Sequence, residues 1–317
     1  SLPLVIDDPS DTWSHNVDAY PDVIGAFHAT GPVELVAEDG VRRTLRVESA
    51  WGRSRIIQEY TLYPRKRVVD VTLTIDWHEQ LKMLKLAFPL ALSEARVTAS
   101  APYGWVEREA DGQEEPCQSW VDVSGEGPQG PLGACLINDS KYGYDVLDNT
   151  FRLSVLRSPI YAFHIPRMMV PGVTYPYIDQ GRQVLRLRLL PHDGEWRAVH
   201  PVRQSEALHH PFIPRWVAPR SGTRHSLSLL RVSPEDVVLT VAKMAEDGER
   251  LIVRGYETAG RPARVVIASA ALGHTWTHAV RPHEVWTLAL PLDGGAPVPL
   301  NLLEEPLADA RPADAQP

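Results

Sequence analysis

Residues 69–77 read VDVTLTIDW, and apolar and polar side chains alternate along this stretch without a break. Its apolar positions are Val69, Val71, Leu73, Ile75 and Trp77. Because successive side chains of a β-strand point to opposite faces, this period of two predicts an antiparallel strand with one face buried. The 28 prolines and 21 glycines are spread along the whole chain and leave little room for long helices. The sequence therefore predicts a mainly β protein.

The positions of the prolines also predict where one domain ends and the next begins. The stretch PFIPRWVAP at residues 211–219 has three prolines within nine positions, which is typical of a connection between domains. We expect a first domain at residues 1–218, a small antiparallel β-sandwich at residues 219–305 and a disordered tail at residues 306–317. Short helical turns are predicted at residues 17–27 and 203–210.

Composition excludes several classes of protein. The formal net charge of −8 argues against a nucleic-acid partner, because such binding depends on Lys and Arg neutralising phosphates. Apolar runs stay well below the roughly 18 residues needed to cross a bilayer, so we expect no membrane association. Two cysteines and no visible secretion signal indicate a cytoplasmic protein. A first residue other than Met, followed by the strand-like LVI, indicates a piece cut from a longer polypeptide.

Motifs of common enzyme classes are missing from the sequence. It has no G-x-S-x-G, no phosphate loop, no G-x-G-x-x-G and no H-E-x-x-H. In HTWTH, His274 and His278 would lie roughly 13 Å apart on a strand, too far apart to share a metal ion. Acidic residues are numerous, but spacing along the chain cannot place two of them across a sugar. We therefore predict no catalytic residue and no metal ligand.

The stretch NDSKYGYD at residues 138–145 contains no aliphatic side chain and follows the apolar ACLI, which predicts a loop leaving a buried strand. The candidates for sugar contact in this loop are Asn138, Asp139, Lys141, Tyr142, Tyr144 and Asp145. Tyrosine rings can stack on a sugar, and the neighbouring polar groups can bond its hydroxyls. A structural loop tied by Asn and Asp to its own backbone around Gly143 fits equally well. Residues 138–140 also form an N-x-S glycosylation sequence.

Blocks spread over nearly the whole chain carry a family resemblance. They are DPSDTWSH (8–15), VDVTLTIDWHEQLKMLKLAFPL (69–90), YGWVER (103–108), WVDVS (120–124), NDSKYGYDV (138–146), FRLSVLRSP (151–159), LLPHDGEWR (189–197), LTVAKMAEDGERLIVRGYE (239–257) and EVWTLALPL (284–292). In this order they resemble the C-terminal half of an α-mannosidase of glycoside hydrolase family 38.

The resemblance implies an architecture and a role. Such enzymes carry a zinc-dependent catalytic α/β barrel, a three-helix bundle, a mutarotase-like β supersandwich and smaller β-sandwiches, and this sequence matches only the β part. It implies a non-catalytic C-terminal portion that supports the barrel and shapes its cleft for a mannose-containing oligosaccharide. The missing barrel is then its partner and the holder of zinc, with no cofactor in this chain. By the same analogy Arg157 lines the cleft, and it fits equally well as a buried ion-pair partner.

Two other classes of function fit the same sequence. A standalone carbohydrate-binding module would bind mannose oligosaccharides without a barrel. An independent mutarotase-like enzyme would need a histidine and an acid that meet on a concave face. A homo-oligomer is compatible with each of these functions.

Overall fold

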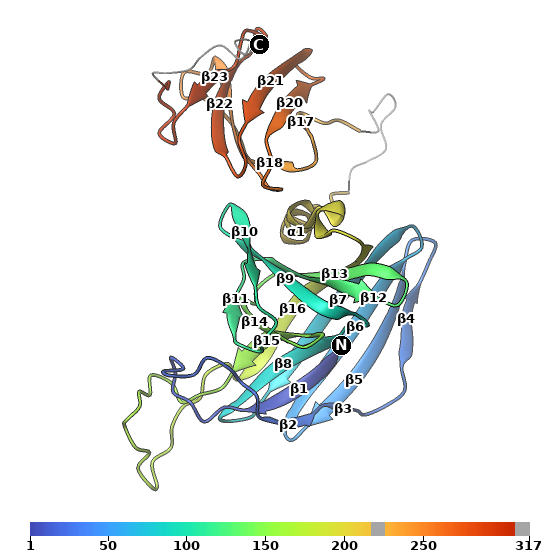
Figure 1. The fold of residues 1–317 in the computed structure, drawn as a ribbon, viewed down its shortest axis with the longest axis vertical. Coiled ribbons are helices and arrows are strands. Elements are labelled where there is room, and N and C mark those ends of the chain that lie inside the picture. Colours follow the sequence, from blue (N-terminus) through green and yellow to red (C-terminus); the bar gives the residue numbers. More distant parts are fainter. Residues whose placement is uncertain (217–225, 308–317) are drawn as a thin grey trace. The chain divides into compact units, whose positions relative to one another are not determined.

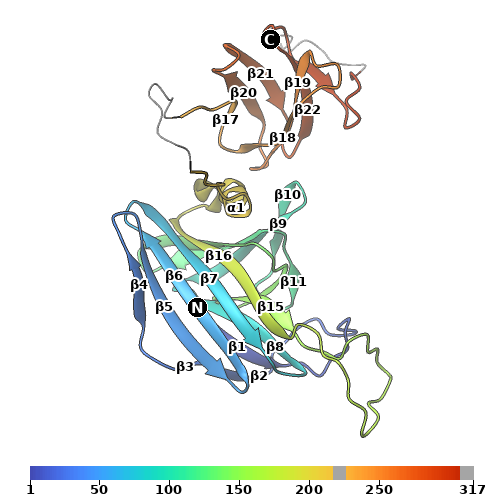
Figure 2. The same cartoon turned by 180° about the vertical axis from the view of Figure 1, so that it is seen from behind.

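The computed structural model describes residues 1–216 and 226–307, which fall into two compact units. Unit 1 comprises Ser1–Ala101 and Trp105–His209, and unit 2 comprises Pro102–Gly104 and His210–Pro317. Both are built mainly from antiparallel strands (Figures 1 and 2), which confirms the predicted fold class of a large β supersandwich followed by a small antiparallel sandwich. The boundary expected at residues 218 and 219 and most of the tail expected at residues 306–317 lie outside the described residues.

The smaller sheet of unit 1 has the strand order β11-β14-β15-β8-β1-β2. Its strands are β11 (Glu115–Pro116), β14 (Gly143–Leu147), β15 (Thr150–Arg157), β8 (Lys82–Pro89), β1 (Leu2–Asp7) and β2 (Val23–Ala26). Neighbouring strands are antiparallel, and β8 lies between β1 and β15, two strands that are far apart in the sequence.

The larger sheet of unit 1 has the order β10-β9-β12-β13-β16-β7-β6-β5-β3, with β4 also paired to β5. Its strands are β10 (Gly104–Arg108), β9 (Ser93–Ala101), β12 (Trp120–Gly127), β13 (Gly130–Asn138), β16 (Gly181–Asp193), β7 (Lys66–Trp77), β6 (Ser54–Tyr63), β5 (Arg43–Trp51), β4 (Glu34–Glu38) and β3 (His28–Ala29).

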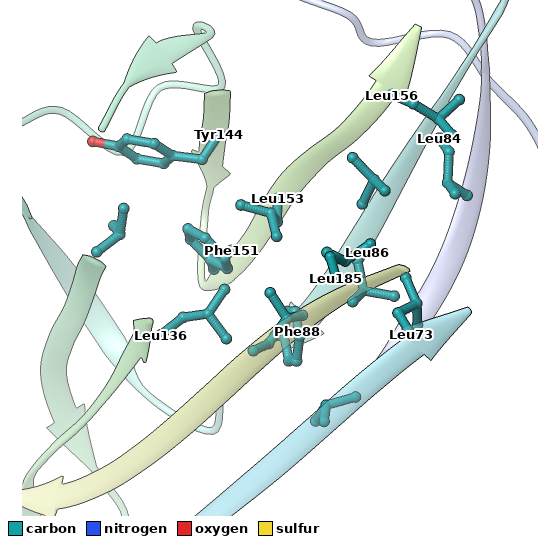
Figure 3. Packing of buried hydrophobic residues seen from close by; sticks show 14 of the residues in the cluster. Leu73, Leu84, Leu86, Phe88, Leu136, Tyr144, Phe151, Leu153, Leu156 and Leu185 are labelled. Carbon is teal, nitrogen blue, oxygen red and sulfur yellow. The ribbon is translucent and has the colours of Figure 1, made fainter. Parts of the chain in front are cut away.

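The main core of unit 1 lies between its two sheets. The smaller sheet contributes Leu86 and Phe151, and the larger sheet contributes Leu73 and Leu185, whose side chains gather between the strands in Figure 3. The alternation at residues 69–77 is confirmed, because the apolar side chains of β7 from Val71 onward are at most 2% exposed. Period-two patterning therefore fixes which face of this strand is buried.

A second apolar cluster covers the other face of the larger sheet. It joins sheet residues to two short helices, η1 (Trp196–Val199) and α1 (Pro201–His209). The helix predicted at residues 203–210 is confirmed. The helical turn predicted at residues 17–27 is wrong, because that segment has no helix and ends in β2, which pairs with β1. No helix of the described chain combines the length and the apolar character needed to cross a membrane.

Unit 2 is a small sandwich of two antiparallel sheets, with the orders β17-β20-β21 and β18-β19-β22-β23. Its strands are β17 (Arg231–Ser233), β18 (Val237–Met244), β19 (Arg250–Glu257), β20 (Ala263–Ser269), β21 (His274–Val280), β22 (Val285–Pro291) and β23 (Val298–Leu300). Its core includes Val253, Ile267, Trp276 and Leu288, drawn from both sheets. The second unit is therefore the small antiparallel β-sandwich that the sequence predicts for this part of the chain.

Candidate functional site

The predicted sugar-contact loop is a short connection between β13 and β14. Asn138 ends β13, is 1% exposed, and accepts hydrogen bonds at Oδ1 from the backbone N–H groups of Ser140 (3.2 Å) and Lys141 (2.7 Å). This is the local side-chain turn that asparagine commonly forms. Its amide nitrogen lies 3.9 Å from Cys117 Sγ, so the side chain is used in holding the turn.

The next polar residues tie the loop to β16. Asp139 forms an ion pair with Arg186, with 3.0 Å between Oδ2 and Nε, and also accepts the Arg186 backbone N–H at 3.0 Å. Lys141 donates from Nζ to Gln183 Oε1 at 3.0 Å. Burial of the Lys141 ammonium lowers its pKa. Both side chains therefore hold the loop against the larger sheet.

The two tyrosines of the loop lie in opposite environments. Tyr142 is 62% exposed, whereas Tyr144 belongs to β14 and is 1% exposed. The Tyr144 ring stacks on Phe151 at 5.7 Å between centroids and lies within the core shown in Figure 3. Its hydroxyl has no hydrogen-bond partner among the described residues, and burial raises its pKa. Of the two rings, only Tyr142 presents a free face to solvent.

Asp145 belongs to a buried charge cluster on the outer side of the smaller sheet. Its carboxylate accepts hydrogen bonds from Lys85 Nζ and from Arg152 Nε, the latter at 2.5 Å. Lys85 also donates to Glu114, which accepts a hydrogen bond from Ser154. The side chains of Lys85 and Asp145 are both fully buried. Asp145 is therefore the ion-pair partner of a buried lysine and of Arg152.

Arg157 ends β15 and binds the first acidic loop of the chain. Its Nε lies 2.8 Å from Asp8 Oδ2, and its Nη2 donates to Asp8 Oδ1 (3.2 Å), Ser10 Oγ (2.6 Å) and the Asp11 carbonyl (3.2 Å). The guanidinium carbon also lies 5.3 Å from the centroid of the Tyr20 ring. The Asp8 side chain is fully buried. Of the two interpretations left open for Arg157, the ion pair is the one with contacts in the structure.

Beside this ion pair, the loops at residues 8–22 and 158–180 are joined by hydrogen bonds. We call these two joined loops the loop latch. Thr12 donates its backbone N–H to the Phe163 carbonyl (3.2 Å) and its hydroxyl to the Ile160 carbonyl (2.6 Å), and Phe163 N–H donates back to Thr12 Oγ1 (3.0 Å). Both views show the two loops side by side at the end of unit 1 opposite α1 (Figures 1 and 2).

The loop latch gathers a group of side chains that motif analysis missed: Asp11, Trp13, His15 and His164. The His15 and His164 rings lie 4.4 Å apart, and Trp13 lies 6.1 Å from His15 and 5.9 Å from His164, between ring centroids. Asp11 is buried beneath them. Asp11, Trp13 and His15 are close together in the sequence as DTWSH, but His164 comes from a distant segment. No local motif therefore indicated that the four side chains meet.

Hydrogen bonds hold the Asp11 carboxylate in its charged form. Burial acts to raise its pKa, but the His15 side chain and the backbone N–H groups of His15, Ile165 and Trp13 donate to it. These donors outweigh burial and hold the pKa of Asp11 well below its usual range. The carboxylate is therefore an anionic anchor for both loops.

The second loop of the latch exposes apolar side chains to solvent. Met168 is 81% exposed, and Tyr161, Met169 and Val170 are each more than half exposed. A cavity of about 370 Å³ opens against this loop. Its lining comprises Gln80, Met169, Val170, Pro171, Val173, Thr174, Tyr175 and Tyr177, so none of the seven predicted sugar-contact residues borders it.

Three acidic side chains of this region are held in ion pairs. Asp139, Asp145 and Asp8 are each bonded to a lysine or arginine side chain. These contacts position the loops, while Tyr142 presents an exposed aromatic ring.

Comparison with known proteins agrees with this architecture. The family model "Glycosyl hydrolases family 38 C-terminal domain" matches residues 6–167, and "Glycosyl hydrolases family 38 C-terminal beta sandwich domain" matches residues 236–316. The chain is 27% identical over 270 residues to "Alpha-mannosidase 2C1" of Homo sapiens, covering 80% of this chain and 24% of that protein. "Alpha-mannosidase G" of Dictyostelium discoideum is 25% identical over 219 residues, covering 66% and 19%.

A solved structure shows the same fold. The crystal structure of an alpha-mannosidase from Enterococcus faecalis V583 superposes with a TM-score of 0.71 at 14% identity, over 91% of this chain and 38% of that chain. The chain thus spans about a quarter or less of the curated relatives described above. The resemblance seen in the sequence is confirmed: this chain belongs to glycosyl hydrolase family 38 and carries the C-terminal β domains of that family.

Proposed function

We propose that this chain is the non-catalytic C-terminal part of a cytoplasmic α-mannosidase, in which it supports the catalytic barrel and shapes the cleft for a mannose-containing oligosaccharide. Family membership and the names of the matched relatives support this proposal. The zinc that the family resemblance implies would be bound by the barrel, and no step of the hydrolysis is assigned to this chain.

The observation that carries the proposal is the loop latch with its exposed apolar loop. Large apolar side chains such as Met168, Tyr161 and Trp13 lie in solvent at one end of unit 1. Clustered exposed apolar groups mark contact surfaces for another protein part. The partly buried Arg157–Asp8 pair and the Thr12 hydrogen bonds hold both loops in one arrangement. An apolar surface on loops that are fixed in one arrangement can pack against a neighbouring barrel and support it.

The seven predicted sugar-contact residues take two different roles in this proposal. Tyr142, which is exposed, would contact the oligosaccharide directly by ring stacking. The others would act through position: Asn138, Asp139 and Lys141 hold the loop, and Tyr144, Asp145 and Arg157 belong to the packed strands below it.

The main test joins this chain to a family 38 catalytic barrel and measures hydrolysis of an aryl α-mannoside. The isolated chain should show no turnover with or without zinc, whereas the joined protein should be active. Turnover by the pure isolated chain would overturn the non-catalytic assignment.

A second test addresses the role of Tyr142 in the joined protein. Tyr142→Ala should raise KM for an oligosaccharide substrate, because the ring face is lost. Tyr142→Phe is the matched control and should keep near-normal KM, because it keeps the ring. Equal KM values for the alanine variant and the unmodified protein would reject direct contact.

The exposed Tyr142 ring also fits a standalone carbohydrate-binding module, which calorimetry can distinguish. Titration of the isolated chain with mannose oligosaccharides should give no heat at millimolar sugar if the cleft forms only with the barrel. Saturable heat would favour the binding-module alternative.

A further inference from the structure

Three side chains with ligand chemistry meet at the loop latch. Asp11, His15 and His164 each offer one ligand atom, and these atoms lie within 4.8 Å of one another. Imidazole nitrogen is the ligand that zinc and neighbouring divalent metals use most readily beside carboxylate and thiolate. We propose that Asp11, His15 and His164 form a binding site for one divalent transition-metal ion of the zinc type. This inference uses only residues of this chain and does not depend on the proposed function.

The hydrogen bonds of Asp11 assign it the role of orienting group. Its Oδ1 accepts the backbone N–H groups of Trp13 (3.0 Å) and His15 (3.2 Å), and its Oδ2 accepts Ile165 N–H (3.1 Å) and His15 Nδ1 (2.7 Å). A carboxylate offers about four acceptor positions, and all of them are used. Asp11 therefore serves the metal through His15, as carboxylates commonly do behind a ligating histidine.

This contact leaves one nitrogen of His15 available to the metal. With Nδ1–H donated to Asp11, the neutral ring carries its lone pair on Nε2. The His15 ring faces the His164 ring at 4.4 Å between centroids, with 48° between the ring planes. The two imidazoles thus supply the direct ligands, and water completes an open coordination sphere.

Binding requires the two imidazole rings to move closer together. Two nitrogens on one tetrahedral zinc lie about 3.3 Å apart, given Zn–N bonds of about 2.0–2.1 Å. One ligand atom of each of Asp11, His15 and His164 lies within 4.8 Å of the others, and rotation of the exposed histidine side chains can bring the chosen nitrogens together. His15 and His164 are both exposed, so neither ring must leave a packed core in order to move.

The latch also fixes the two backbones that carry the ligands. Thr12 bonds Ile160 and Phe163, and Ile165 N–H bonds Asp11, so the residues flanking His164 are held directly against the loop of His15. Little loop ordering remains to be done when the ion binds. A metal ion here would join two loops that the hydrogen bonds already hold together.

Isothermal titration of the metal-free 317-residue chain with zinc chloride near pH 7.5 tests the site. We expect saturable binding of one ion per chain. His164→Ala should weaken binding at least tenfold, and Asp11→Asn should weaken it by about 10- to 100-fold through loss of the orienting contact. The matched control is His28→Ala, which removes an exposed histidine of β3 and should bind zinc as the unmodified chain does.

Trp13 gives a second readout that does not depend on heat. Its ring lies about as close to His15 as to His164, so a bound copper(II) ion should quench its fluorescence, and Trp13→Phe should remove that quenched component. Absence of saturable zinc binding to the unmodified chain, or unchanged affinity in His164→Ala, would overturn the proposal. Because His164 is exposed, this variant should fold normally even if Asp11→Asn does not.

Discussion

Replacement of Arg157 by methionine should destabilise unit 1 by about 3 kcal/mol. Removal of one partner of a buried ion pair costs about 3–5 kcal/mol, because the other charge is left in a medium of low polarity. The Asp8 side chain is fully buried, but the Arg157 side chain is 19% exposed, so some water reaches the site and the lower value applies. Methionine keeps an unbranched apolar side chain at this position and removes the guanidinium, including its contact with the Tyr20 ring.

The measurement is the midpoint of thermal unfolding of unit 1, followed by calorimetry so that the transitions of the two units can be separated. For a unit of this size, a loss of about 3 kcal/mol corresponds to a fall of about 6–12 °C. Arg67→Met is the matched control, because Arg67 pairs with Asp193 on the surface, where both side chains are more than 70% exposed. Such a pair contributes about 0–1 kcal/mol.

A double variant makes the test specific to the charge left behind. Asp8→Asn keeps an acceptor for the hydroxyl and backbone N–H of Ser10 but removes the negative charge. Added to Arg157→Met, it should restore about 1 kcal/mol or more, because no unpaired charge then remains buried. Equal midpoints for Arg157→Met and Arg67→Met, or no recovery in the double variant, would refute the reasoning.

Three further predictions concern buried polar groups. Tyr144→Phe should leave unit 1 unchanged or about 1 kcal/mol more stable in urea unfolding, because it removes a buried hydroxyl without a partner among the described residues; a clear loss would contradict this. The Asp11 pKa is depressed on folding, so its stabilisation is complete above about pH 4 and is lost as the pH falls further. Asp11→Asn should therefore flatten the acid side of the stability curve, and an unchanged slope below that pH would count against the assignment. Burial raises the pKa of Cys117 to about 12 and that of Cys135 well above its usual value, so neither thiol should react with a disulfide reagent at pH 8 until the chain unfolds; fast labelling of the native chain would show otherwise.

The strands could be predicted because the alternation of apolar and polar residues that defines a strand lies within a few consecutive positions. In β7 the period of two is carried by the residues themselves, from Val71 to Trp77, and burial follows it. The same holds for β16, where Leu185, Leu187 and Leu189 alternate with arginines. The helical turn predicted before β2 is absent because the spacing of apolar residues over a short stretch does not distinguish a helical turn from an irregular loop.

The contacts of the polar residues were not predictable, because they depend on strand register. Asp145 lies opposite Arg152 across the β14–β15 pair, and Ser154 lies opposite Lys85 across the β15–β8 pair. No spacing in the stretch NDSKYGYD shows that these strands are neighbours. Tyr144 was therefore grouped with exposed Tyr142, although it is the second residue of β14 and its own side chain belongs to the core. Likewise, His15 and His164 meet only because β1, β8 and β15 lie side by side.

The loop latch has a consequence for protein engineering within the family. Thr12 and Ile160 are separated by 148 positions, yet each loop supplies donors or acceptors that the other requires. The two segments therefore behave as one cassette, and neither can be exchanged alone. A chimera that takes residues 158–180 from another family 38 member but keeps residues 8–22 would leave Asp11 and Thr12 facing unmatched backbone groups. A graft that moves both segments together keeps these pairings intact.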